Sequence, residues 1–184
     1  MSDLRLDFVV FAGDPDEGAQ AVGSEPALDE AASFEWPGAY GRVIVQRDGQ
    51  VILQHKPDPI FSLVTNLVRA LSYVIEGEAE NVLLAESEQG FAIEPAGNDV
   101  LLSFFAGDPY DPDELTLEPQ TFSLDAFGEQ VLSMGERLVE LMRKSDADIF
   151  ERDEYSGGLV QFLEEGREAF KTYQLRVERG LRVE

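Results

Sequence analysis

Carboxylates are the side chains of this sequence with the most capacity for chemistry, because 37 Asp and Glu stand against 14 Lys and Arg and one His. Asp108, Asp111, Asp113 and Glu114 form the richest short cluster. Hard cations such as Ca²⁺ bind clustered carboxylate oxygens, so these four residues are the candidate metal ligands and Ca²⁺ the candidate cofactor. One interpretation is therefore a carboxylate- or divalent-metal-dependent enzyme that uses the loop 108–114.

This cluster overlaps a repeated pentapeptide. Phe-Ala-Gly-Asp-Pro occurs at 11–15 and again at 105–109, each time after an apolar run. The alternative to a pair of calcium loops is turn chemistry, because glycine supplies conformational freedom and proline ends strand pairing. An EF-hand register started at Asp14 places Ala19 where a glycine is required. Turn chemistry is therefore the favoured interpretation of the repeat.

His55 is the only imidazole that could act as a base. It follows a predicted strand beside Lys56 and opposite Arg42, and such cations depress the pKa of an imidazole without orienting it for catalysis. The chain has no cysteine, no Gly-x-Ser-x-Gly elbow and no phosphate-binding glycine motif. We therefore expect His55 to be a structural or surface residue, and we assign no catalytic or cofactor-binding residue.

The formal net charge of −23 constrains the partners. Nucleic acids and anionic membranes attract Lys and Arg, so neither is expected as a partner. Residues 70–136 contain 15 acidic residues and no Lys or Arg. We expect the solvent face of this region to be predominantly acidic, and such a surface attracts basic proteins. The candidate partner-binding residues are Glu86, Glu88 and Asp111, together with the aromatic residues Trp36 and Tyr40.

These observations favour a non-enzymatic acidic protein-binding module for a basic partner. Small acidic α+β immunity proteins that inhibit bacterial toxins offer an analogy in composition and fold class. Solubility or adaptation to high salt is the alternative explanation of the charge, and Trp36 could equally pack down to hold its loop. A third interpretation is a homo-oligomeric structural protein, whose basic C-terminal helix (Arg167, Lys171, Arg176, Arg179, Arg182) docks on a neighbour's acidic body.

The N-terminus lacks the basic flank and apolar core of a signal peptide. No run approaches the roughly 18 apolar residues of a membrane span. We therefore expect a cytoplasmic protein that does not enter a membrane.

The elements that must position these residues begin with an alternating strand at 4–11. A long acidic excursion with Gly and Pro follows at 12–38. Two apolar runs then flank Asp48-Gly49, a pair suited to a two-residue type I′ hairpin turn. If the hairpin has no bulge, its register places Val43, Val45 and Ile52 on one face. Because both faces of the hairpin carry apolar residues, we expect other parts of the protein to cover both of them.

Apolar residues at three- and four-residue steps predict a helix over 58–76, with Asp58 as its N-cap and Pro59 at its first position. Short turns then predict an antiparallel meander of strands at 81–85, 90–94 and 99–105. An edge strand at 114–118 is expected to stop at Pro119. The remainder is predicted to be helical, from a cap at Ser123 and again over 157–178.

The order β-ββ-α-βββ(β)-α-α predicts an α+β fold with one antiparallel sheet of about six or seven strands and three helices packed against it. No linker separates two self-sufficient cores, so residues 1–184 are predicted to form one domain.

Overall fold

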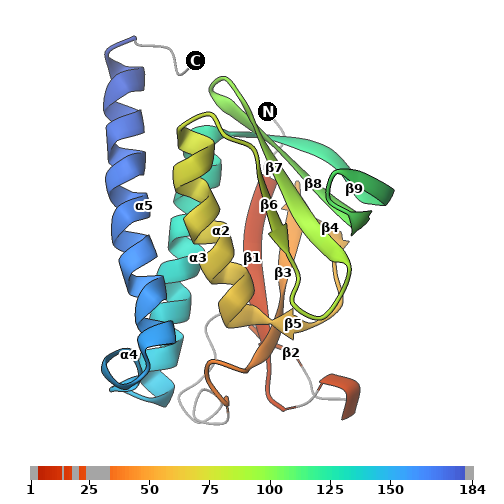
Figure 1. Ribbon diagram of the computed structural model, residues 1–184, viewed down its shortest axis with the longest axis vertical. Helices are drawn as coiled ribbons and strands as arrows, with labels where there is room; N and C mark the ends of the chain where they lie inside the picture. The colour runs from red at the N-terminus through yellow and green to blue at the C-terminus, as the bar shows by residue number, and fades with distance from the viewer. Residues whose placement is uncertain (1–3, 14, 18–20, 24–33, 181–184) are drawn as a thin grey trace.

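The computed structural model describes residues 4–13, 15–17, 21–23 and 34–180 and has an α+β architecture (Figure 1). Two antiparallel sheets lie on one side and the helices on the other. Sheet A has the order β2-β1-β3-β4, with β5 paired to β3, and sheet B has the order β6-β7-β8-β9. Sheet A comprises β1 (Leu4–Phe11), β2 (Ala21–Gly23), β3 (Tyr40–Arg47), β4 (Gln50–Gln54) and β5 (Asp58–Pro59). Sheet B comprises β6 (Glu80–Leu83), β7 (Gln89–Ala96), β8 (Asp99–Asp108) and β9 (Asp111–Ser123).

The coarse fold class is confirmed, but the prediction of a single sheet is wrong. The meander of sheet B does not join the β3–β4 hairpin, because α2 separates β4 from β6 in the chain and no ladder links β4 to sheet B. β9, which lies beside β4, shifts register three times against β8. A strand that bends at bulges cannot keep a continuous ladder with a second neighbour.

The described residues hold four α-helices rather than three, because a short helix forms between the predicted helix that begins at Ser123 and the one predicted over 157–178. They are α2 (Ile60–Ile75), α3 (Leu124–Ser145), α4 (Ile149–Arg152) and α5 (Glu154–Glu178), besides the 3-10 turn η1 (Pro15–Glu17). α5 lies outermost in Figure 1, with α2 and α3 between it and the strands. The buried residues of α2 belong to one continuous apolar cluster that includes both sheets. Residues 14, 18–20 and 24–33 of the predicted excursion 12–38 lie outside the described residues.

The hairpin turn is confirmed, since Asp48 and Gly49 have φ angles of 51° and 77°, as a type I′ turn requires. Its register differs from the simplest one, because a bulge between Val45 and Gln46 places Leu53 opposite Val45. Leu53 therefore takes the buried position expected for Ile52. The other face of the hairpin is only partly covered, and 51% of Val51 is exposed.

The start of α2 differs from the predicted cap. Pro59 is the N-cap and no side chain caps this end of the helix. Asp58 is instead buried and pairs with Gly41 across β5 and β3. Its two carboxylate oxygens accept hydrogen bonds from the backbone N–H groups of Ala85 and Glu86, each at 2.9 Å. A residue expected to act locally thus joins sheet A to the turn between β6 and β7.

β9 continues through Pro119, where the sequence predicted an end. Leu102 of β8 pairs with Gln120 and Phe104 with Leu117, so a bulge takes up the proline. β9 pairs only with β8, and proline is tolerated on an edge strand because no neighbour needs its missing N–H. The strand then leads directly into α3, where Ser123 accepts a bond from the Ala126 N–H at 3.2 Å as the predicted cap.

The outer edge of β1 is closed partly by side chains. Gln130 of α3 accepts a hydrogen bond from the Leu6 N–H and donates one to the Leu4 carbonyl. The next outward N–H, that of Phe8, donates to the Asp7 carboxylate at 2.8 Å, and Arg137 pairs with that carboxylate at 2.7 Å. From Val9 onward the edge pairs with β2. α3 therefore occupies the part of the edge that β2 does not reach.

Candidate protein-interaction surface

The side of sheet B that faces away from the helices carries most of the candidate region. Strand alternation sends Val82, Phe91, Ile93, Leu102 and Phe104 into the core. On the other side lies a set of apolar side chains that we call the apolar strip: Leu83, Ala92, Leu101, Phe105 and Leu115. Leu83 is 51% and Leu115 42% exposed, whereas Phe105 is buried between its neighbours.

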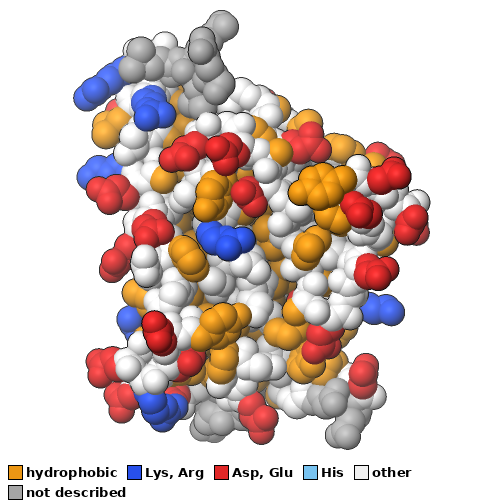
Figure 2. Space-filling model, viewed as in Figure 1, with side chains coloured by type: hydrophobic (Ala, Val, Ile, Leu, Met, Phe, Trp, Pro, Cys, Tyr) orange, Lys and Arg blue, Asp and Glu red, His pale blue; other side chains and the backbone are white. Residues whose placement is uncertain are grey.

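The expectation of a predominantly acidic face needs correction, because the centre of this face is apolar. The carboxylates flank it, and every charged side chain that β6, β7, β8 and β9 contribute is acidic. Figure 2 shows orange apolar side chains bordered by red acidic ones over the β8–β9 end of the molecule. The flanking carboxylates are Glu94, Asp108, Asp111, Asp113, Glu114 and Glu118.

A hollow of about 560 Å³ lies on this face, and Leu83 and Ala92 contribute to its lining. Glu94 supplies a carboxylate from the same outer face, and Tyr110 lines the hollow from the tip of the β8–β9 hairpin. Glu80 borders the hollow, but it pairs with the core residue Ile93, so its side chain lies on the other side of the sheet. Tyr110 is 91% exposed, so its ring has almost no packing partner. This tyrosine is not among the sequence-predicted residues, although its place after Asp108-Pro109 in the turn is the signal that could have revealed it.

The acidic candidates Glu86, Glu88 and Asp111 lie at one end of sheet B. Glu86 and Glu88 belong to the turn before β7, and Asp111 begins β9 beyond the next turn at the same end of the meander. The Glu88 carbonyl accepts a bond from the Gly107 N–H at 2.7 Å, which ties the two turns together. Tyr40 joins this group, because its hydroxyl donates to the Glu86 carboxylate.

Trp36 lies apart from these residues. Its indole N–H donates to the Ser145 hydroxyl at 3.0 Å, at the end of α3, and its ring packs edge-on against Phe34. The side chain is partly buried against the apolar core. These contacts favour the interpretation that Trp36 holds its loop in place.

The candidate metal ligands Asp108, Asp111, Asp113 and Glu114 lie along the β8–β9 hairpin. Within the described ranges, no three or more His, Asp or Glu side chains are arranged to hold a metal ion. An oxygen of Asp108 instead accepts a bond from the Tyr110 N–H at 2.8 Å and stabilises the turn. The calcium assignment stays a prediction.

The two pentapeptides share a backbone feature. Gly13 and Gly107 have φ angles of 105° and 98°, a region that glycine enters without strain. The preceding Phe11 and Phe105 are both buried but lie outside the main apolar cluster, each on the outer face of its sheet. This shared geometry supports turn chemistry as the reason for the repeat.

His55 is buried, and both of its ring nitrogens are bound to the backbone. Nε2 accepts a bond from the Val43 N–H at 2.8 Å, so Nδ1 carries the proton and donates it to the Lys56 carbonyl. The ring stacks on Phe104 at a centroid distance of 5.6 Å. Burial lowers the pKa of His55 below its ordinary value, which keeps the ring neutral. Such a histidine has no nitrogen left to take a proton from a substrate.

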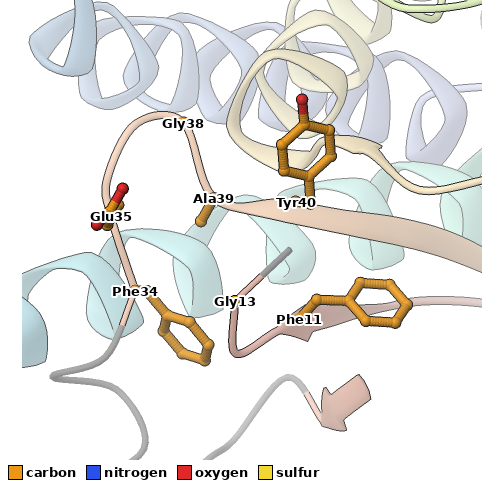
Figure 3. Close-up of a pocket in the computed structure, with 7 residues that line it drawn as sticks. All are labelled: Phe11, Gly13, Phe34, Glu35, Gly38, Ala39 and Tyr40. Carbon is orange, nitrogen blue, oxygen red and sulfur yellow. The ribbon is translucent and has the colours of Figure 1, made fainter. Parts of the chain in front are cut away.

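A second hollow of about 320 Å³ lies beside the loop that enters β3, and Figure 3 shows its lining. Phe11, Phe34 and Ala39 give it apolar walls. The Tyr40 hydroxyl and the Glu35 carboxylate lie on opposite sides of it in Figure 3, so its polar groups do not converge on one point. The described residues that line it therefore offer no pair of groups for acid–base chemistry.

Comparison with protein-family models, curated proteins and solved structures finds no match to this chain. None of the helices in the described ranges combines the length and the apolar character needed to cross a bilayer.

Proposed function

We propose that this protein is a non-enzymatic binding module, of the immunity or inhibitor type, that captures a basic protein through the outer face of sheet B. The observation that carries the proposal is the apolar strip flanked by carboxylates, on strands whose charged side chains are all acidic. An exposed apolar patch supplies affinity when it is covered, and a charged border of one sign selects a partner of the other.

Both parts of the surface support this function. Leu83, Leu115 and Tyr110 are large apolar or aromatic side chains that solvent reaches, and aromatic anchors dominate binding energy in many interfaces. The surrounding carboxylates accelerate encounter with a basic protein, because their fields add over the surface. The turns at Glu86, Glu88 and Asp111 extend this acidic border at one end of the sheet.

The test begins with affinity capture from the native organism at low and high salt, followed by association kinetics with the purified partner. Reversal of Glu86, Glu88 and Asp111 to Lys is expected to lower the on-rate about tenfold at low salt, because electrostatic steering is lost. The free energy of unfolding should change by less than about 1 kcal/mol, since exposed carboxylates contribute little to stability.

The matched control reverses Glu151, Glu164 and Glu165, which are equally exposed but lie on α4 and α5. It changes the net charge by the same amount and should affect the on-rate less. If the association rate changes neither with salt nor with reversal of Glu86, Glu88 and Asp111, the acidic surface serves solubility alone.

A further inference from the structure

We infer that the hollow under Tyr110 receives a lysine or arginine side chain of the partner. The inference rests on the proposed function and deepens it, because it names the group that the surface recognises. The hollow combines an apolar floor, the Glu94 carboxylate and an exposed aromatic ring, which are the complements of the parts of a long cationic side chain.

The floor comes from alternate positions of neighbouring strands. Leu83 of β6 and Ala92 of β7 point to the outer face, because their neighbours Val82 and Phe91 are buried in the core. The aliphatic stems of Lys and Arg pack along such apolar surface while their charged ends stay polar. A short or purely polar side chain would leave this floor uncovered.

One carboxylate lies where the charged end would arrive. Glu94 pairs with Leu101 of the apolar strip, so its side chain lies on the outer face, whereas Glu80 pairs with the core residue Ile93 and has its side chain on the opposite side of the sheet. Within the described ranges Glu94 has no ion-pair partner. A cation beside Glu94 is attracted to it, whereas an anionic side chain would be repelled.

Tyr110 completes the hollow from above. A two-residue loop, Pro109-Tyr110, joins the paired residues Asp108 and Asp111, and the Asp108 carboxylate holds the Tyr110 N–H. The backbone therefore positions the ring although the ring itself is 91% exposed. Cations bind the faces of such rings, and a guanidinium also stacks on them.

The test uses a peptide of alternating arginine and alanine, together with the same peptide carrying citrulline, which keeps the side-chain shape without the charge. Binding is followed by amide chemical shifts of the labelled full-length protein at low salt. We expect the arginine peptide to shift the amides of Leu83, Ala92 and Tyr110, and the citrulline peptide to bind about tenfold more weakly.

Two sets of variants locate the contact. Glu94→Gln should weaken the arginine peptide several-fold, whereas Glu164→Gln, the same charge change on α5, should weaken it less than about twofold. Tyr110→Ala should weaken binding several-fold and Tyr110→Phe should restore most of it, since phenylalanine keeps the ring. Unchanged amide shifts away from the substitutions show that each variant is folded.

Two results would overturn the inference. If the peptide binds but shifts amides elsewhere, or if Glu94→Gln and Glu164→Gln weaken it equally, the hollow is not the site and the binding module itself still stands. If neither peptide binds at low salt, the hollow does not recognise a cationic side chain, and the proposed function is then decided by the kinetics with the native partner.

Discussion

The Nε2 atom of His55 lies 2.8 Å from the backbone nitrogen of Val43 and takes the place of a strand in pairing with it. β4 ends at Gln54, one residue earlier, so the side chain of His55 continues the hydrogen bonding of β3 where the backbone of β4 stops. The same ring stacks on Phe104 of sheet B. One side chain thus links the two sheets and satisfies a buried N–H group.

This geometry predicts a loss of stability in acid. Burial lowers the pKa of His55, and the positive Arg42 adds to this, while the Lys56 carbonyl and the negative Asp58 oppose it. The unfolded chain therefore takes up a proton that the folded chain resists. His55 contributes no pH dependence well above about pH 6.5, and below it the free energy of unfolding falls by at most about 1.4 kcal/mol per pH unit.

Urea unfolding at pH 7.5, 6.5 and 5.5 measures this effect, with His55→Phe as the control because it keeps the ring without a titrating group. The wild-type protein should lose more stability than His55→Phe across the interval. If the unfolding free energy falls equally with pH in the two proteins, His55 does not couple protonation to folding.

Asp58 predicts a graded series. Asp58→Ala removes the buried carboxylate that the Ala85 and Glu86 N–H groups donate to and should cost about 1.5–3 kcal/mol of unfolding free energy. Asp58→Asn retains one acceptor oxygen and should cost less. Thermal melting with calorimetry checks the order, and Glu164→Gln on the exposed side of α5 should change the midpoint little. A melting midpoint of Asp58→Ala equal to that of the wild-type protein would show that these two hydrogen bonds do not stabilise the fold.

Gly41 and Gly158 form a matched pair for a third prediction. A Cβ at position 41 would overlap the Val9 carbonyl and lie 2.7 Å from the Ile60 Cβ, so Gly41→Ala should cost at least about 2 kcal/mol. A Cβ at position 158 meets only Phe162, at 3.9 Å, and alanine in this helix should gain about 0.5–1 kcal/mol. Denaturant midpoints measure both variants, and similar values would contradict the close approach of α2 to β3.

Calcium provides the fourth prediction. In the described ranges the carboxylates of 108–114 do not form a metal-binding group, so 2 mM CaCl2 should raise the melting midpoint no more than MgCl2 does at the same ionic strength, about 6 mM. A calcium-specific rise that Asp111→Asn with Asp113→Asn abolishes would instead establish the site and revive the metal-dependent alternative.

The parts of the fold that the sequence predicts well are those governed by near neighbours. The backbone preferences of Asp48 and Gly49 are enough to determine their turn. The apolar spacing that predicts α2 lies entirely within the 16 residues of the helix. Asp58 was assigned to a helix cap because that is its local option, but its partners lie 27 and 28 residues away. No local pattern reveals such partners.

The candidate surface was predicted only in its charge. An acidic run without cations is visible in the chain, but which side of a strand faces the core depends on a register set by bulges. Its residue type predicts that Phe105 packs in the main core, but Phe105 is buried on the outer face of sheet B. The hollow likewise forms because Tyr110 approaches Ala92 and Leu83, which lie far from it in the sequence.

Gln130 has a consequence for how this protein behaves when it is crowded. An unpaired strand edge is a template on which another chain can add a strand, and growth of that kind leads to domain exchange or fibrils. Because the Gln130 amide already occupies the Leu6 N–H and the Leu4 carbonyl, an incoming strand would have to displace a helix before it could pair there. The Gln130 side chain thereby closes this part of the β1 edge, and the packing of α3 protects it against the addition of a strand.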